Sequence, residues 1–200
     1  MNLVSTDLKF GELICRRITR RIVIHHSASP DVPAAEIHRW HLQRGWSGIG
    51  YHFVIRKDGS IEKGRPLETV GAHAGPAGNS DSIAVCLTGD FTHALPADEQ
   101  MAALHNLVLW LKTLYPSGLA VVRHCDLAAT GCPGHLFPWD RFTASLNSSS
   151  SWKEELMDRA LSAGLIFDQH DPDEPAPKWF VTALVLNLLD LITVNDKLKG

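Results

Sequence analysis

Short β-branched apolar runs alternate with amphipathic helical segments along most of this sequence. The strand-like runs are Arg21–His25, Ser82–Thr88 and Leu119–Arg123. Apolar residues at helical spacing mark Ala34–Gln43 and Pro96–Tyr115. Strands that alternate with helices predict an α/β fold, in which helices flank a central mixed β-sheet.

A hairpin and a glycine-rich stretch lie between these segments. Tyr51–Arg56 alternates as a strand, and Lys57–Ser60 contains an Asp-Gly turn that leads into Ile61–Lys63. Val70–Asn79 is rich in glycine and is predicted to be a loop.

Charge divides the chain into two unequal parts. The whole chain has a formal net charge of -3, which gives no reason to expect a nucleic-acid partner. Trp152–Gly200 holds five basic and nine acidic residues, whereas the preceding residues are close to neutral. We therefore predict a catalytic domain over residues 1–146, a polar linker over 147–151 and an acidic helical module over 152–200. This module could bind the cell wall, form a dimer or be a passive cap.

The final segment raises the question of a membrane span. Lys178–Ile192 is apolar on almost every side, but Asn187 and Asp190 interrupt it. A membrane-spanning helix needs about 20 mostly apolar residues. We therefore expect a buried helix, at a homodimer contact formed by the C-terminal helices, and no membrane span.

Three residues at the C-terminal ends of predicted strands form a candidate metal site. His25 ends one strand, His124 follows another, and Cys132 lies in the loop beyond it. Ligands of open α/β sheets bind at this edge. Two imidazoles and one thiolate suit zinc and leave the fourth position free for water, as in catalytic sites.

Five blocks of this sequence resemble the zinc amidases that cut peptidoglycan, a family that includes phage endolysins and animal peptidoglycan recognition proteins. The blocks are, in order, IVIHHSAS, RGWSGIGYHFVIRKDGSIEKGR, VGAHAG, NSDSIAVCLTGDF and RHCDLAATGCPG. The resemblance covers about Arg21 to Leu146. It implies hydrolysis of the amide bond between N-acetylmuramic acid and L-alanine, for bacterial cell lysis by a phage or prophage protein.

The resemblance also implies roles for individual residues. His25, His124 and Cys132 match the Zn²⁺ ligands of the family, and Tyr51 and Thr130 match its assisting catalytic positions. Some phage members carry lysine where this chain has Thr130, so the similarity to the animal amidases is closer there. Tyrosine has an ordinary pKa of about 10, which favours hydrogen bonding over proton abstraction.

Other histidines and cysteines have alternative explanations. His26 and His73 are candidates for substrate contact, against simple packing for each. His38 and His41 have helical spacing but lack the glutamate of a metalloprotease motif, so we expect ordinary helix-surface residues. Two cysteines are left out of the metal site. Cys86 is expected in the core, and Cys125 as a fourth protein ligand would block catalysis.

Three rival functions remain open. The first is a protein of the same fold that binds peptidoglycan without cutting it, which the presence of Cys132 disfavours. The second is an intracellular amidase that recycles muropeptides, in which an aspartate tends to be the last ligand. The third is binding to RNA polymerase, which nothing in the N-terminal segment supports.

The N-terminal sequence and the cysteines predict where the chain is made. Its start lacks the apolar core of a secretory signal, and the four cysteines form no CxxC pair. We expect synthesis in a reducing cytoplasm, with access to the cell wall after release by lysis.

Overall fold

The computed structural model describes residues 3–115, 118–146, 160–162, 164 and 166. The predicted linker and nearly all of the acidic module, including the helix proposed for a homodimer contact, lie outside these residues. No helix within the described part of the chain is both long and apolar enough to cross a bilayer.

A six-stranded mixed sheet forms the centre of the fold, in the order β1-β4-β3-β5-β2-β6. The strands are β1 (Leu3–Val4), β2 (Arg21–His26), β3 (Phe53–Ile55), β4 (Ile61–Lys63), β5 (Ser82–Leu87) and β6 (Ala120–Arg123). The β3–β4 hairpin is antiparallel, and the other neighbouring strands pair in parallel. The predicted fold class is confirmed.

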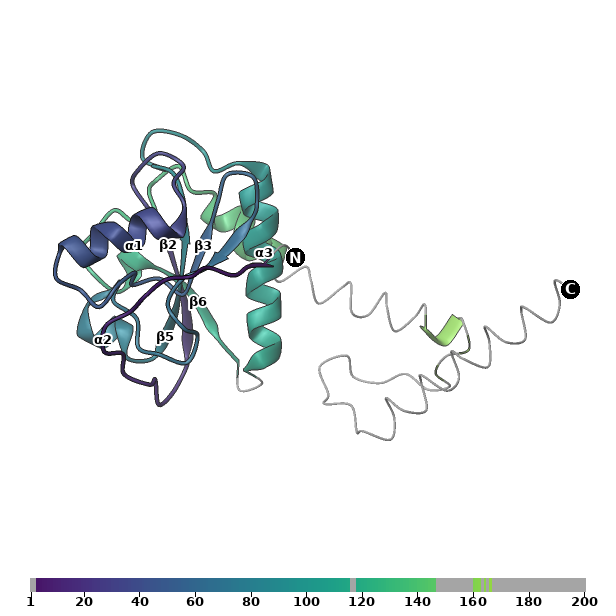
Figure 1. Cartoon of the computed structure of the whole chain (residues 1–200). Helices are drawn as coiled ribbons and strands as arrows, with labels where there is room; N and C mark the ends of the chain where they lie inside the picture. The colour runs from purple at the N-terminus through teal and green to yellow at the C-terminus, as the bar shows by residue number, and fades with distance from the viewer. Residues whose placement is uncertain (1–2, 116–117, 147–159, 163, 165, 167–200) are drawn as a thin grey trace, which may run out of the picture. The chain divides into compact units, whose positions relative to one another are not determined.

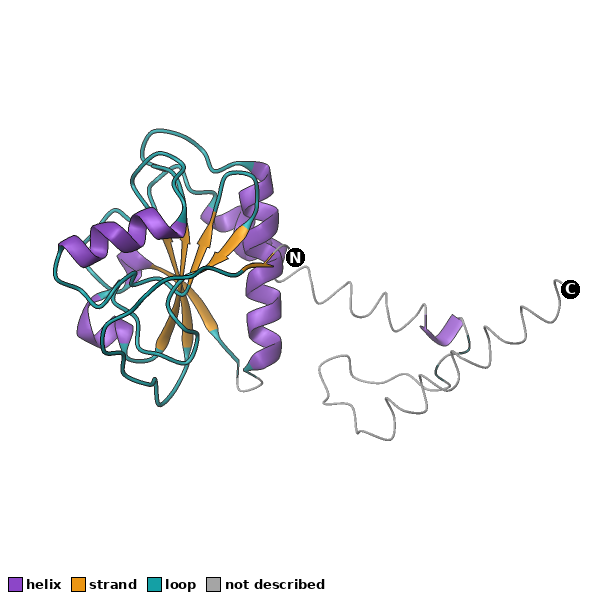
Figure 2. Cartoon of the chain, viewed as in Figure 1, coloured by secondary structure: helices purple, strands orange, loops and turns teal. Residues whose placement is uncertain are grey.

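Helices cover both faces of this sheet (Figures 1 and 2). The helix α1 (Ala34–Gln43) packs through Ala34 and Ile37 with Val54 of β3. On the opposite face, Trp110 of α3 (Asp98–Leu114) meets Phe53 edge to face, with ring centroids 6.2 Å apart. Val54 and Phe53 are adjacent in β3, so strand alternation directs them to the two different layers.

One segment differs from its predicted structure. Within the stretch expected to be a loop, Gly75–Asn79 forms the short helix α2, with proline in its first turn. The Asn79 side-chain oxygen accepts hydrogen bonds from the amides of His73 and Ala74, both at 2.8 Å. This side chain stabilises a turn that glycine content alone does not reveal.

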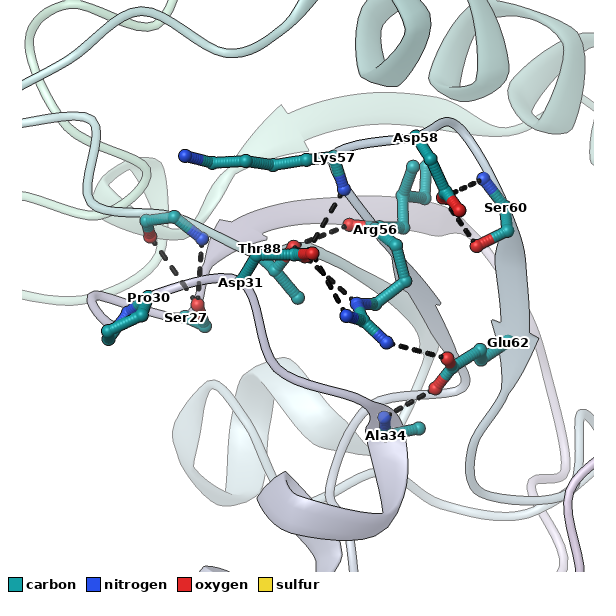
Figure 3. Close-up of polar contacts among 12 residues, drawn as sticks. Ser27, Pro30, Asp31, Ala34, Arg56, Lys57, Asp58, Ser60, Glu62 and Thr88 are labelled. Carbon is teal, nitrogen blue, oxygen red and sulfur yellow. Dashed lines mark hydrogen bonds and ion pairs between the residues drawn. The ribbon is translucent and has the colours of Figure 1, made fainter.

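A polar network fastens the loop after β2 to the hairpin (Figure 3). Arg56 donates two hydrogen bonds of 2.9 Å to the Asp31 carboxylate, and the Thr88 hydroxyl donates a third. Arg56 also pairs with Glu62, which accepts a hydrogen bond from the first amide of α1. The network thus fixes the chain that leads from β2 to α1.

Replacing Asp31 with asparagine should lower the free energy of unfolding by about 2 kcal/mol at neutral pH, because it removes hydrogen bonds to a charged group. Hydrogen bonding to Arg56 holds the pKa of the Asp31 carboxyl well below its ordinary value. The stabilisation is therefore present above the unfolded-state pKa of about 3.9 and is lost as the pH falls towards the folded-state pKa. Urea denaturation at several pH values should show that the difference in the free energy of unfolding between the wild type and Asp31→Asn becomes smaller below about pH 4. A difference that does not change with pH would contradict this assignment.

Candidate functional site

The candidate site is built around His25, near the C-terminal end of β2, an interior strand of the sheet. The sheet register pairs His25 with Cys86 of β5, and Cys86 with Val54 of β3. Paired residues share a face of the sheet, so His25 lies on the face that α1 covers. Its side chain is buried.

Two further metal-ligating side chains come close to His25. His124 begins the short 3-10 helix η1 (His124–Asp126) directly after β6, and Cys132 lies in the loop that follows. The Cys125 amide donates a 2.9 Å hydrogen bond to the Cys132 carbonyl, which ties the loop back onto η1. One ligand atom from each of His25, His124 and Cys132 lies within 4.8 Å of the others. The three predicted ligands are therefore together in space and can hold a metal ion.

The protonation states of these groups suit a cation. Burial, followed by the charges of nearby histidines, lowers the pKa of His25 well below its ordinary value, and burial also lowers the pKa of His124. Both rings are therefore neutral at pH 7, with a lone pair to donate. Burial raises the pKa of the Cys132 thiol to about 11. A bound metal ion deprotonates a coordinating thiol, so Cys132 would bind a cation as a thiolate despite its raised pKa.

Tyr51 lies beside the cluster, with its ring centroid 5.1 Å from that of His25. Cys86, the cysteine that the sequence assigned to the core, is buried and pairs with His25 in the sheet register. Burial raises the pKa of Tyr51 well above its ordinary value. The hydroxyl therefore stays protonated at neutral pH and is a hydrogen-bond donor.

Thr130 is exposed, and its hydroxyl oxygen accepts a 3.3 Å hydrogen bond from the Cys132 amide. It thus adjoins the ligand loop, and its assisting role stays a prediction. The His26 ring lies on the other face of the sheet, where Nδ1 accepts a hydrogen bond from the Phe91 amide. The backbone amide of His26 instead reaches the cluster and donates to Cys132 Sγ over 3.4 Å. For His26, the packing alternative fits this position better than substrate contact.

The sequence profile of a family described as "N-acetylmuramoyl-L-alanine amidase" matches residues 16–135, more than half of the chain. The chain belongs to this amidase family. Among its relatives, the endolysin of Klebsiella phage KP32 is 40% identical over 128 residues, which cover 59% of this chain and 82% of that protein.

Solved structures agree with this assignment. The amidase LysC from Clostridium intestinale URNW has a TM-score of 0.70 and 36% identity, with 74% of this chain and 98% of that chain covered. Drosophila PGRP-LB has a TM-score of 0.62 and 30% identity, with 68% and 90% covered. The fold and the family are therefore established over the part of the chain that holds the site.

Two histidines of the amidase differ from their predicted environment. His38 and His41 were expected on the surface of α1, but both are buried. Their Nδ1 atoms accept hydrogen bonds from the amides of Ile49 and Gly50, at 3.1 and 2.9 Å. These bonds position the segment that leads into Tyr51. The expectation was wrong because this face of α1 packs against the backbone at Ile49 and Gly50. The spacing of residues in the helix does not reveal that contact.

Sequence reasoning also missed two buried arginines that hold the loop before His73. Arg65 donates to the carbonyls of Ile49 and Val70, at 2.8 and 2.9 Å. Arg16 donates to those of Leu67 and Thr69, both at 2.8 Å. The only sequence signal is that these charges flank apolar segments. Such a pattern does not distinguish a buried arginine from a solvated one.

Proposed function

We propose that this amidase hydrolyses the amide bond between N-acetylmuramic acid and L-alanine of peptidoglycan, with zinc as its metal. The observation that carries the proposal is the convergence of His25, His124 and Cys132 on one face of the sheet. The family supports the bond that is cut. The endolysin relatives support a role in bacterial lysis, in which the protein reaches the wall after release.

The donor set fits zinc. A thiolate and two neutral imidazoles are typical zinc ligands, at distances of about 2.0–2.3 Å, and three protein ligands are typical of catalytic sites. When bound there, zinc would act as a Lewis acid and make water nucleophilic near neutral pH.

The protein groups around the cluster would then act on the substrate. Tyr51 Oη, which keeps its proton, would donate a hydrogen bond to the scissile carbonyl oxygen. A donor at this position stabilises the negative charge that develops as the carbonyl becomes tetrahedral. Thr130, which is exposed in the ligand loop two residues before Cys132, would also contact the substrate. Burial strengthens the interaction that Tyr51 would make.

A protein that only binds peptidoglycan is the alternative function. It has less support, because such a protein does not need the third ligand Cys132 or a protonated Tyr51 beside the cluster.

Mass spectrometry of peptidoglycan digested by the full chain tests the proposed reaction. We expect free stem peptides that begin with L-alanine, together with glycan strands that have lost their peptides. A chelator should abolish both products, and added zinc should restore them. Products that keep the lactyl-alanine amide intact, or digestion that a chelator does not affect, would refute the proposal.

The same digestion tests the proposed domain division. A chain that ends at Leu146 should still cut soluble muropeptides, because every residue of the site lies before that position. The proposed wall-binding or dimerisation role of residues 152–200 predicts weaker binding to intact walls or loss of a dimer. A truncated chain that folds but cuts no soluble substrate would refute the division.

A further inference from the structure

A chain of hydrogen-bonding groups leads away from His25 on the side opposite the ligand cluster. His25 Nε2 lies 2.9 Å from Nδ1 of His73. On the far side of the His73 ring, Nε2 lies 3.1 Å from the Ser82 hydroxyl oxygen. That hydroxyl lies 2.5 Å from the carbonyl oxygen of Gly78. The chain therefore runs from a metal ligand to the backbone through two side chains without a proposed catalytic role.

The backbone carbonyl at the end determines which atom is the donor in every hydrogen bond of this chain. A carbonyl oxygen only accepts, so the single hydroxyl proton of Ser82 is donated to Gly78. The Ser82 oxygen then accepts from His73, whose proton must lie on Nε2. In a neutral ring the other nitrogen is an acceptor, so His73 Nδ1 accepts from His25.

The consequence for His25 is a defined tautomer. Its proton lies on Nε2, and the lone pair lies on Nδ1. That Nδ1 atom is 3.7 Å from Cys132 Sγ, on the side of the ligand cluster. The lone pair therefore faces the position where the metal would be bound.

The position of the His73 ring is itself fixed by its surroundings. Both the His73 and Ala74 amides donate to the Asn79 side chain. A Cβ at Gly71 would lie 2.5 Å from the His73 ring, so only glycine leaves room for this ring orientation. A ring held in this way suits an orienting role better than the substrate contact that the sequence suggested.

We propose that His73 and Ser82 are positioning residues that hold His25 in the Nε2–H tautomer, so that Nδ1 is free to bind the metal. The proposal rests on the metal site of the proposed function. Partners of this kind orient metal-bound histidines, and their loss typically lowers metal affinity about 10–100-fold.

Zinc affinity of the full chain, measured by competition with a chelator, tests the proposal. His73→Ala should weaken zinc binding about 10–100-fold. Ser82→Ala should weaken it about tenfold, at the lower end of that range. Without the serine oxygen as acceptor, His73 can carry its proton on Nδ1 and donate it to His25 Nε2. The proton of His25 then lies on Nδ1, the nitrogen that faces the metal. His73→Asn should bind more tightly than His73→Ala, because the asparagine oxygen can accept near the position of Nδ1. His93→Ala, which removes a histidine with an 83% exposed side chain, is the matched control and should bind as the wild type.

Imidazole ¹⁵N spectra of the zinc-loaded chain give a second readout that does not depend on activity. Protons are expected on Nε2 of both His25 and His73. A proton on Nδ1 of His73, or zinc affinity of His73→Ala within twofold of the wild type, would overturn the relay. If Cys132→Ala weakens zinc binding in the same series, the metal site itself stands. Equal zinc affinity in the wild type and Cys132→Ala would overturn both the proposed function and the relay.

Discussion

Replacing Cys132 with alanine is expected to lower the rate of wall lysis at least about a thousandfold, because the metal site loses its only thiolate. Metal ions contribute several kcal/mol to such reactions, and each 1.36 kcal/mol corresponds to about a tenfold change in rate. Bound zinc should fall in parallel with activity. A turbidity assay on bacterial walls, together with the zinc content of the purified protein, provides the measurement.

Cys125→Ala is the matched control for this experiment. Cys125 adjoins His124 in the sequence but is outside the ligand cluster, and it contributes its backbone amide to the loop, which alanine retains. The variant should keep its zinc and most of its activity. The ligand assignment fails if Cys132→Ala remains fully lytic, or if both variants lose zinc to the same extent.

Replacing Arg65 with methionine should lower the free energy of unfolding by about 3–5 kcal/mol. The side chain is buried, and its loss leaves the carbonyls of Ile49 and Val70 without donors. Each buried acceptor left unsatisfied costs about 1–3 kcal/mol, and the charged donor makes these bonds stronger than average. This loss is a large share of the total stability of a typical domain, which is about 5–15 kcal/mol.

Arg39→Met provides the comparison, since it removes the same charge from an exposed position. Arg39 pairs with Glu36 on α1, and its side chain is 55% exposed. Its replacement should leave the free energy of unfolding nearly unchanged, because exposed ion pairs contribute little to stability. Urea denaturation of both variants gives the comparison. A similar loss of stability in the two variants would mean that the hydrogen bonds of Arg65 do not stabilise the loop before His73.

Local pattern was sufficient for the main elements of the fold. β-branched runs predicted β2 and β5, and apolar spacing gave α1 at its observed bounds. The short strand β1 was not predicted, because two residues at the edge of the sheet are defined by their pairing with β4 rather than by their own propensity. The short helix α2 was missed because a side chain of Asn79 stabilises it locally.

The candidate site also has one part that the sequence predicted and another that required the tertiary structure. The order of the sequence blocks was enough to choose His25, His124 and Cys132, because their residue types and their places after strands carry the chemistry. The surroundings of His73 required the tertiary structure. Its partners come from β2 and from the first residue of β5, which are distant from one another in the sequence.

The sequence by itself determined the α/β class, the family and the three candidate ligands, since each depends on residue type, periodicity or order along the chain. Only the tertiary structure decided which faces the histidines occupy, that His38 and His41 are buried, and which groups lie within hydrogen-bonding distance of His25. Those properties depend on hydrogen bonds between segments far apart in the chain. A hydrogen bond requires a donor and an acceptor within about 3 Å, and that distance exists only after the sheet has formed.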